Sequence, residues 1–261
     1  MALRINLNAS ALNAHRQLLG TDTALGASIE RLSSGFRINR AADDPAGLAI
    51  SENLRAQVSG LSQAISNSSD AVNLIRTAEG ALSEVHTLLR TMRNLALHAA
   101  NTGTNDATAI AADQTQIESS LAALNRIASN TQFGTKKLLD GSATGLIFQV
   151  GANANQTTSV DIGGVSASDL SIAGINVTSD AQAAITALDN AISSISTLRA
   201  KLGATQRDLE SNISSLGIAK ENIAASESSI RDADMAGEMV TFTRNQILLQ
   251  AGTAMLTQAN Q

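Results

Sequence analysis

Residues 181–231 read AQAAITALDNAISSISTLRAKLGATQRDLESNISSLGIAKENIAASESSIR and show the clearest helical periodicity of the chain. Large aliphatic residues recur in it at every seventh position, at Leu188, Ile195, Leu202, Leu209, Leu216, Ile223 and Ile230. The neighbouring row begins with Ile185 and Ile192 but is apolar at fewer than half of its positions. One strict row beside a relaxed one is typical of a long helix packed in a bundle, rather than of an isolated two-stranded coiled coil.

Two further helices are expected before this one. The longer begins at Pro45, where Asp44 can cap the helix and proline suits the first helical position, and it extends to about Ala100. A third is expected over residues 106–129. At about 1.5 Å per residue the longer helix measures about 80 Å, whereas a compact chain of this length is about 50 Å across. We therefore expect an elongated rod.

The two ends of the chain carry matching apolar stripes. Near the N-terminus the stripe consists of Leu18, Leu25 and Leu32 with Ile29 beside them, and near the C-terminus of Met235, Phe242, Leu249 and Leu256 with Met239 beside them. Each stripe predicts an amphipathic helix, and the simplest partner of each is the other. A pair of helices would still leave apolar sides open, which a monomer rarely does. These nine residues are our candidate polymerisation seam.

Residues 142–178 differ from the rest of the chain. Gly, Ser, Thr and Asn surround short β-rich runs at Leu146–Val150 and Ser159–Ile162, which predicts one or two hairpins at the tip of the rod. A hairpin alone is marginally stable, so it must lie on the helices. The expected fold is mainly α: an elongated antiparallel helical bundle or coiled-coil rod with a small β-hairpin region and paired N- and C-terminal helices.

Composition excludes several classes of function. The 261 residues contain no cysteine, which rules out disulfides, thiolate metal sites and a cysteine nucleophile. His15, His86 and His98 lack the spacing of metal ligands, and no phosphate-binding or dinucleotide-binding motif occurs. A net charge of −5, with 16% charged residues, argues against nucleic acid and anionic membranes. We expect no catalytic site, cofactor, metal, nucleic-acid partner or membrane partner, and a partner that is protein.

A cluster of charged residues follows the N-terminal stripe. The cluster consists of Arg31, Arg37 and Arg40 with Asp43 and Asp44 close by in sequence, which favours a subunit-contact loop or intramolecular salt bridges over an anion site.

The sequence shows no targeting or membrane segment. The first ten residues, MALRINLNAS, lack the basic and apolar regions of a signal peptide, and no stretch reaches the ~18 apolar residues of a membrane span.

Three segments resemble bacterial flagellin, the subunit of the flagellar filament. They are IERLSSGFRINRAADDPAGLAI at residues 29–50, MRNLA at 92–96 followed by Ala100-Asn101, and QILLQAGTAMLTQANQ at 246–261. The resemblance covers about residues 1–141 and 180–261. Members of that family usually continue beyond the Ala-Asn-Gln at which this sequence stops.

The resemblance implies an inner terminal coiled-coil domain of residues 1–42 and 232–261, and a rod domain of residues 43–231 without a large variable outer domain. It implies a non-enzymatic structural subunit that self-polymerises into the hollow filament used for swimming. A hook–filament junction protein of similar architecture is the alternative. It also implies an extracellular location, export without a cleaved signal peptide, an export chaperone at the C-terminal helix, and filament-cap and hook-junction proteins as partners.

One family motif is only partly present. Flagellins sensed by the vertebrate innate flagellin receptor carry an arginine where this chain has Thr91 and a glutamate where it has Gln116, whereas Arg93 and Leu95 match. We expect weak or absent activation of that receptor.

Overall fold

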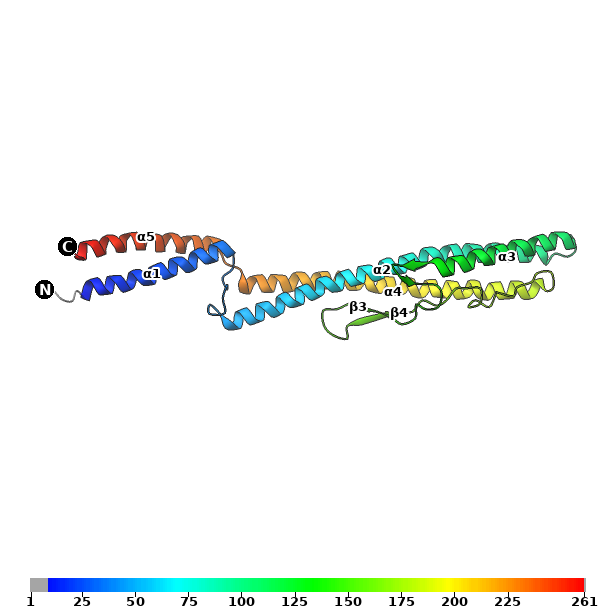
Figure 1. Cartoon of the computed structure of the whole chain (residues 1–261), viewed down its shortest axis with the longest axis horizontal. Coiled ribbons are helices and arrows are strands. Elements are labelled where there is room, and N and C mark those ends of the chain that lie inside the picture. The colour runs from blue at the N-terminus through cyan, green and yellow to red at the C-terminus, as the bar shows by residue number, and fades with distance from the viewer. Residues whose placement is uncertain (1–8, 261) are drawn as a thin grey trace. The chain divides into compact units, whose positions relative to one another are not determined.

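The computed structural model describes residues 9–260, and its helices agree with the predicted ones to within one or two residues (Figure 1). They are α1 (Ala9–Ser34), α2 (Pro45–Ala99), α3 (Ala107–Asn130), α4 (Ala181–Arg231) and α5 (Met235–Asn260). The mainly α fold with long helices and a small β region is confirmed. Residues 1–8, on which most of the signal-peptide prediction rests, and Gln261 lie outside the described residues.

Aspartates start four of the helices. Asp44, Asp106, Asp180 and Asp234 each accept a hydrogen bond from a backbone N–H in the first turn, at 2.8 Å from Gly47 for Asp44. Such caps satisfy donors that the helix itself leaves unpaired. The end of α1 is equally well defined, because Gly35 adopts a φ of 76° and its N–H donates to the carbonyl of Arg31. Local sequence therefore fixes where these helices begin and end.

Contacts divide the chain into two compact units. One unit consists of residues 59–219, and the other combines the described residues up to Val58 with those from Lys220 onward. The domain boundaries near residues 42 and 232 that the family resemblance implies stay a prediction.

The unit of residues 59–219 has a single aliphatic core. The strict heptad row of α4 supplies Leu188, Ile195, Leu202 and Leu209, all of them buried. The facing rows include Leu82 and Leu89 of α2 and Ile117 and Leu124 of α3, and these side chains are completely buried. The buried part of this core contains no aromatic side chain among the described residues, which follows from the 2% aromatic content of the chain.

Two small hairpins follow α3. β1 (Gln132–Phe133) pairs with β2 (Lys136–Lys137), and this hairpin was not predicted. β3 (Leu146–Gln149) pairs antiparallel with β4 (Thr157–Val160), with Leu146 opposite Val160, inside the predicted β region. Both hairpins have four-residue or shorter strands, so they depend on the helices for stability.

The predicted place of the β3–β4 hairpin at the tip is wrong. Asn67 of α2 donates its side-chain N–H to the carbonyl of Gln149 at 3.1 Å. Ala152, in the loop of the hairpin, packs closely against Gly60 of α2: a Cβ added at Gly60 would lie only 3.1 Å from the Cβ of Ala152. The hairpin therefore lies beside the first half of α2. The physical reason is helix length: α3, with 24 residues, returns the chain only part of the way along the 55 residues of α2.

The irregular segment after β4 runs back along α3. Asn125 accepts from the N–H of Ala167 at 2.9 Å, and Gln114 bonds the N–H of Val177 at 2.9 Å and the carbonyl of Ile175 at 3.2 Å. These amide side chains satisfy backbone groups that no strand or helix pairs. The segment delivers the chain to Asp180, where α4 begins.

No helix within residues 9–260 is long and apolar enough to cross a membrane.

Candidate functional site

The predicted pairing of the terminal helices is confirmed: α1 and α5 pack against each other and run antiparallel (Figure 1). Leu18 packs against Gly252, where an added Cβ would lie 3.0 Å from a leucine methyl carbon. Nearer the other end of the pair, the Arg31 guanidinium lies 3.7 Å from the carboxylate of Glu238. These two contacts define the register of the pair.

The inner face of each helix shows a strict coiled-coil spacing of three and four residues. The half-buried or buried positions on this face are Ala14, Leu18, Thr21, Leu25, Ser28 and Leu32 in α1, and Glu238, Phe242, Asn245, Leu249, Gly252 and Leu256 in α5. The register places Ser28 level with Phe242, as it places Leu18 level with Gly252. Large side chains thus face small ones. Six of the nine predicted seam residues lie on this inner face and pair within one chain.

The other three predicted seam residues lie on outer faces. Ile29 is 50% exposed, Met235 46% and Met239 50%. Further exposed apolar side chains outside the nine predicted seam residues are Leu12 and Leu19 in α1 and Val240, Ile247, Leu248 and Met255 in α5. Of these, Leu248 and Met255 widen the C-terminal stripe already in the sequence. Several of these are also seven residues apart, which is the signal that could have found them. The single predicted seam is therefore two faces.

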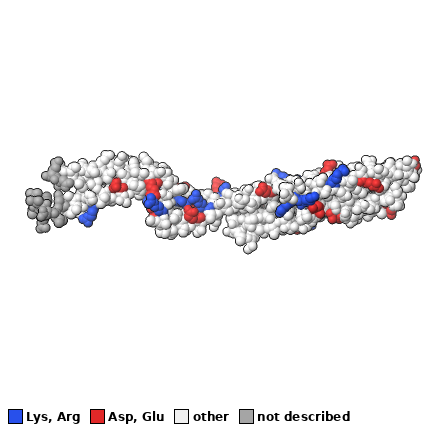
Figure 2. All heavy atoms as spheres, in the orientation of Figure 1, with Lys and Arg blue, Asp and Glu red and all other residues white. Residues whose placement is uncertain are grey.

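A groove crosses the outer surface of α5. Its volume is about 510 Å³, and it is lined by Met239, Val240, Thr243, Arg244, Ile247 and Leu248. A second groove, of about 770 Å³, is polar and lies mainly on α1, lined by Asn13, Arg16, Gln17, Gly20, Thr21, Ala24 and Asn245. On the face drawn in Figure 2, few charged side chains lie over α1 and α5. The helix pair thus has one polar groove and one apolar groove.

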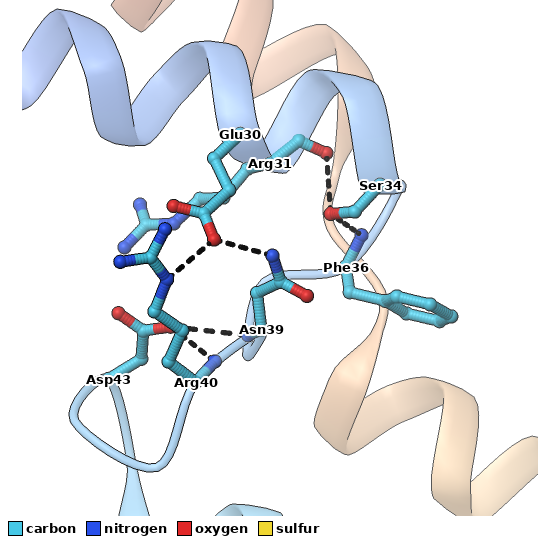
Figure 3. Close-up of polar contacts among 7 residues, drawn as sticks. All are labelled: Glu30, Arg31, Ser34, Phe36, Asn39, Arg40 and Asp43. Atoms are coloured by element: carbon cyan, nitrogen blue, oxygen red, sulfur yellow. Dashed lines mark hydrogen bonds and ion pairs between the residues drawn. The ribbon is translucent and has the colours of Figure 1, made fainter.

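The segment between α1 and α2 folds around two carboxylates (Figure 3). Glu30 accepts from the Nε–H of Arg40 at 2.8 Å and from the side chain of Asn39 at 2.6 Å. Asp43 accepts from the backbone N–H groups of Arg40 at 2.9 Å and Asn39 at 3.2 Å. These two hydrogen bonds lower the pKa of Asp43, and the one from Arg40 makes the larger contribution. Of the predicted loop residues, Arg40 and Asp43 therefore contact each other. The other three have partners elsewhere in the chain: Arg31 pairs with Glu238, the side chain of Arg37 donates to the carbonyl of Ile230, and Asp44 caps α2.

Arg231 clamps the same segment from the end of α4, and sequence reasoning missed it. Its side chain is 10% exposed, donates to Glu52 at 2.6 Å, and lies with its guanidinium carbon 4.8 Å from the centre of the Phe36 ring. Its carbonyl accepts from the N–H of Arg37 at 2.7 Å, and Phe36 forms a β-bridge with Asp232. A charged residue at a helix end carries no sequence signal of burial, so only the fold reveals this clamp.

The segment that resembles the receptor-sensed motif lies on the unit of residues 59–219. Thr91 is exposed and bonds the carbonyl of Thr87 in its own helix, and Gln116 is exposed on α3. Arg93 is engaged by Asp189, with Nε 2.5 Å from the carboxylate, and Leu95 packs against the core. Within residues 9–260, no cluster of three or more potential metal ligands is formed.

Comparison with known proteins decides the family. Residues 5–144 match the model of the bacterial flagellin N-terminal helical region, and residues 185–261 match that of the bacterial flagellin C-terminal helical region. The chain belongs to the bacterial flagellin family. The two matched regions of the family contain the whole of the α1/α5 pair that the structure describes, together with α2, α3 and nearly all of α4.

Relatives of this flagellin family match almost the whole chain. A flagellin of Halalkalibacterium halodurans is 48% identical, covering 98% of this chain and 96% of its own length. A flagellin of Bacillus subtilis (strain 168) is 44% identical, covering 99% of this chain and 97% of its own. Among solved structures, the crystal structure of Bacillus cereus flagellin matches with a TM-score of 0.53 and 29% identity, over 58% of this chain and 88% of that one.

Proposed function

We propose that the chain polymerises, through the outer faces of α1 and α5, into the hollow helical filament of the bacterial flagellum, which is used for swimming. Membership of the flagellin family supports this function. The observation that carries the proposal is that α5 has large apolar side chains on both its inner and its outer face. A helix that is apolar all round belongs in a buried environment. One partner helix covers only one side of it.

The faces suggest how assembly proceeds. Ser28 is the one fully buried residue among those described in α1, so the isolated α1/α5 pair holds little buried apolar surface. We therefore expect these helices to become stably ordered only when neighbouring copies cover their outer faces. Contacts between unlike faces of identical copies do not close into a pair, and they generate an open helical polymer.

Location and partners follow from the same function. We propose that the chain acts outside the cell as a non-enzymatic structural protein, and that it is exported without a cleaved signal peptide. An export chaperone would cover the apolar surface of α5 before assembly, and filament-cap and hook-junction proteins would contact the growing and basal ends. The hook–filament junction function is not favoured, because curated flagellins match the chain over almost its whole length.

Deleting residues 235–261 tests the proposed function. The variant should form no filaments under conditions in which the full chain does, because α1 loses its partner and the apolar groove is gone. Residues 59–219 should keep their fold, since their core contains no residue of α5. Negative-stain microscopy and thermal unfolding measure the two outcomes. Normal filaments from the deletion variant would refute the assembly surface.

We also propose that the chain activates the innate flagellin receptor weakly or not at all. Thr91 and Gln116 supply neutral side chains where sensed flagellins carry an arginine and a glutamate, and Arg93 is held by Asp189. A cell reporter assay should therefore give a response far below that of a sensed flagellin. Replacing Thr91 by Arg together with Gln116 by Glu should raise it. A full-strength response to the unaltered chain would contradict the proposal.

A further inference from the structure

Two unpaired charges of opposite sign lie on the apolar outer surfaces of α1 and α5. Most charged side chains of these helices have partners: Arg16 bonds Asn13, Glu30 bonds Arg40, and Arg31 pairs with Glu238. Asp22 and Arg244 are exposed, and neither side chain makes a hydrogen bond or ion pair with any residue that the structure describes. They are the charged side chains of the helix pair that lack both a hydrogen-bond and an ion-pair partner among the described residues.

Each charge lies among mainly apolar side chains. Asp22 follows Leu19 by three residues and precedes Ile29 by seven, so Leu12, Leu19, Asp22 and Ile29 form one stripe along α1. We call these four residues the α1 stripe. Arg244 lies in the apolar groove of α5, between Val240 and Ile247, and we call the residues lining that groove the α5 groove. Stripe and groove are both mainly apolar around one charge, with exposed His15 seven residues before Asp22 on the side of the stripe and Thr243 in the lining of the groove.

Asp22 and Arg244 cannot pair within one chain. Successive residues of a helix turn by about 100°, so Asp22 faces away from the polar groove that Gly20 and Ala24 line on the other flank of α1. Arg244 directly precedes Asn245, which lines that same polar groove and faces α1, and it therefore points outward from α5. The two side chains lie on opposite sides of the helix pair. Only another molecule can bring them together.

We propose that the α5 groove of one copy binds the α1 stripe of a second copy, with an ion pair between Arg244 and Asp22 at the centre of the contact. Covering either face with an apolar surface alone would leave a desolvated, unpaired charge, which is costly. A second copy supplies the opposite charge and the apolar surface at once. This contact rests on the proposed polymerisation and specifies its partner: because stripe and groove are different surfaces, the contact repeats without closing.

Charge reversal tests the pair, using the full chain and seeds of sheared filaments. Asp22→Lys places a second cation against Arg244, and Arg244→Glu places a second anion against Asp22. Each variant alone should raise the critical concentration for polymerisation at least about ten-fold, measured by pelleting filaments over a range of protein concentrations. An equimolar mixture should polymerise within about two-fold of the unaltered chain. The reason is that the stripe of D22K then meets the groove of R244E with opposite charges, and the native pair forms at the alternate contacts.

The mixture separates the possible outcomes. Single variants that polymerise normally would overturn the contact. Rescue by the double variant D22K/R244E without rescue by mixing would place the pair inside one chain and also overturn it. Rescue by mixing shows in addition that both variants are folded. Failure of the unaltered chain to polymerise would instead refute the proposed function.

Discussion

The core of residues 59–219 and the α1/α5 pair use the same heptad spacing with opposite results. In the core, α2, α3, α4 and the returning segment surround each other, and rows such as Leu188 to Leu209 are completely covered. In the α1/α5 pair, the inner rows are only half-buried and the outer rows are open to solvent. A seven-residue apolar repeat thus predicts a helix and its contact face, but the number of partners decides whether that face is satisfied within one chain.

The core of residues 59–219 and the α1/α5 pair therefore differ in how they are stabilised. A core sealed by its own helices stabilises the monomer whether or not other copies are present. Under the proposed function, the two-helix pair with its apolar groove gains most of its stability from neighbouring copies, and its folding is linked to assembly. Substitutions in the two regions should therefore have different consequences for the monomer and for the filament.

A matched pair of truncations gives the largest difference. Leu82→Ala, at a fully buried position of α2, should lower the free energy of unfolding of the monomer by about 2–5 kcal/mol. Ile247→Ala, at a position 59% exposed, should change it by less than about 0.5 kcal/mol but raise the critical concentration for polymerisation about ten-fold. Chemical denaturation measures the free energy of unfolding, and pelleting of filaments measures the critical concentration. Equal effects of both variants on the monomer would remove the distinction.

Arg231 tests how the other unit is held together. Arg231→Gln removes the ion pair with Glu52 and the contact with Phe36, so the segment between α1 and α2 should open with a loss of about 1–3 kcal/mol. The loss should be local, because this clamp lies outside the core of residues 59–219. Cleavage by trypsin at Arg37 and Arg40 should therefore accelerate while the melting of the core stays unchanged. A parallel shift of both would show that the two units unfold together.

Lowering the pH should have the smallest effect, which we expect at the hydrogen bonds that Asp43 accepts in the loop between α1 and α2. The hydrogen bonds from Arg40 and Asn39 lower the pKa of Asp43 in the folded state, so their stabilisation is fully present above the unfolded pKa and is lost as the pH falls through the folded one. At neutral pH the loop should be unaffected. Below about pH 4 the backbone N–H groups of Asn39 and Arg40 should lose protection from hydrogen exchange. Asp43→Asn should show that weaker protection already at pH 7, and unchanged protection in this variant would contradict the assignment.

Much of the fold can be predicted from the sequence, because a helix that buries one face has apolar residues at a regular spacing. Asp44 and Pro45 at the start of α2 and the heptad row of α4 predict helix boundaries to within a residue or two. The position of the β3–β4 hairpin could not be predicted, since it depends on where α3 ends along α2. The β1–β2 hairpin is too short, with two residues in each strand, to produce an alternating pattern.

The candidate surface was only half predictable for a related reason. Because α5 is apolar on every side, its sequence contains several overlapping seven-residue rows, and nothing local tells which row faces α1. Pairing with α1 makes that choice, placing Phe242 and Leu249 inside and Val240, Ile247 and Leu248 outside. Asp22, Arg244 and Arg231 are ordinary surface charges in the sequence. Only the fold shows that Arg231 is buried and paired with Glu52, whereas Asp22 and Arg244 are exposed.

Hydrogen exchange of the backbone amides in monomer and filament measures whether neighbouring copies complete α1 and α5. We expect amides of α1 and α5 to exchange rapidly in the monomer and to become protected at least about 100-fold in the filament, because their outer faces are then covered. Core amides of residues 59–219 should be strongly protected in both states. Equal protection of α1 and α5 in monomer and filament would contradict the claim that these helices are completed by neighbouring copies.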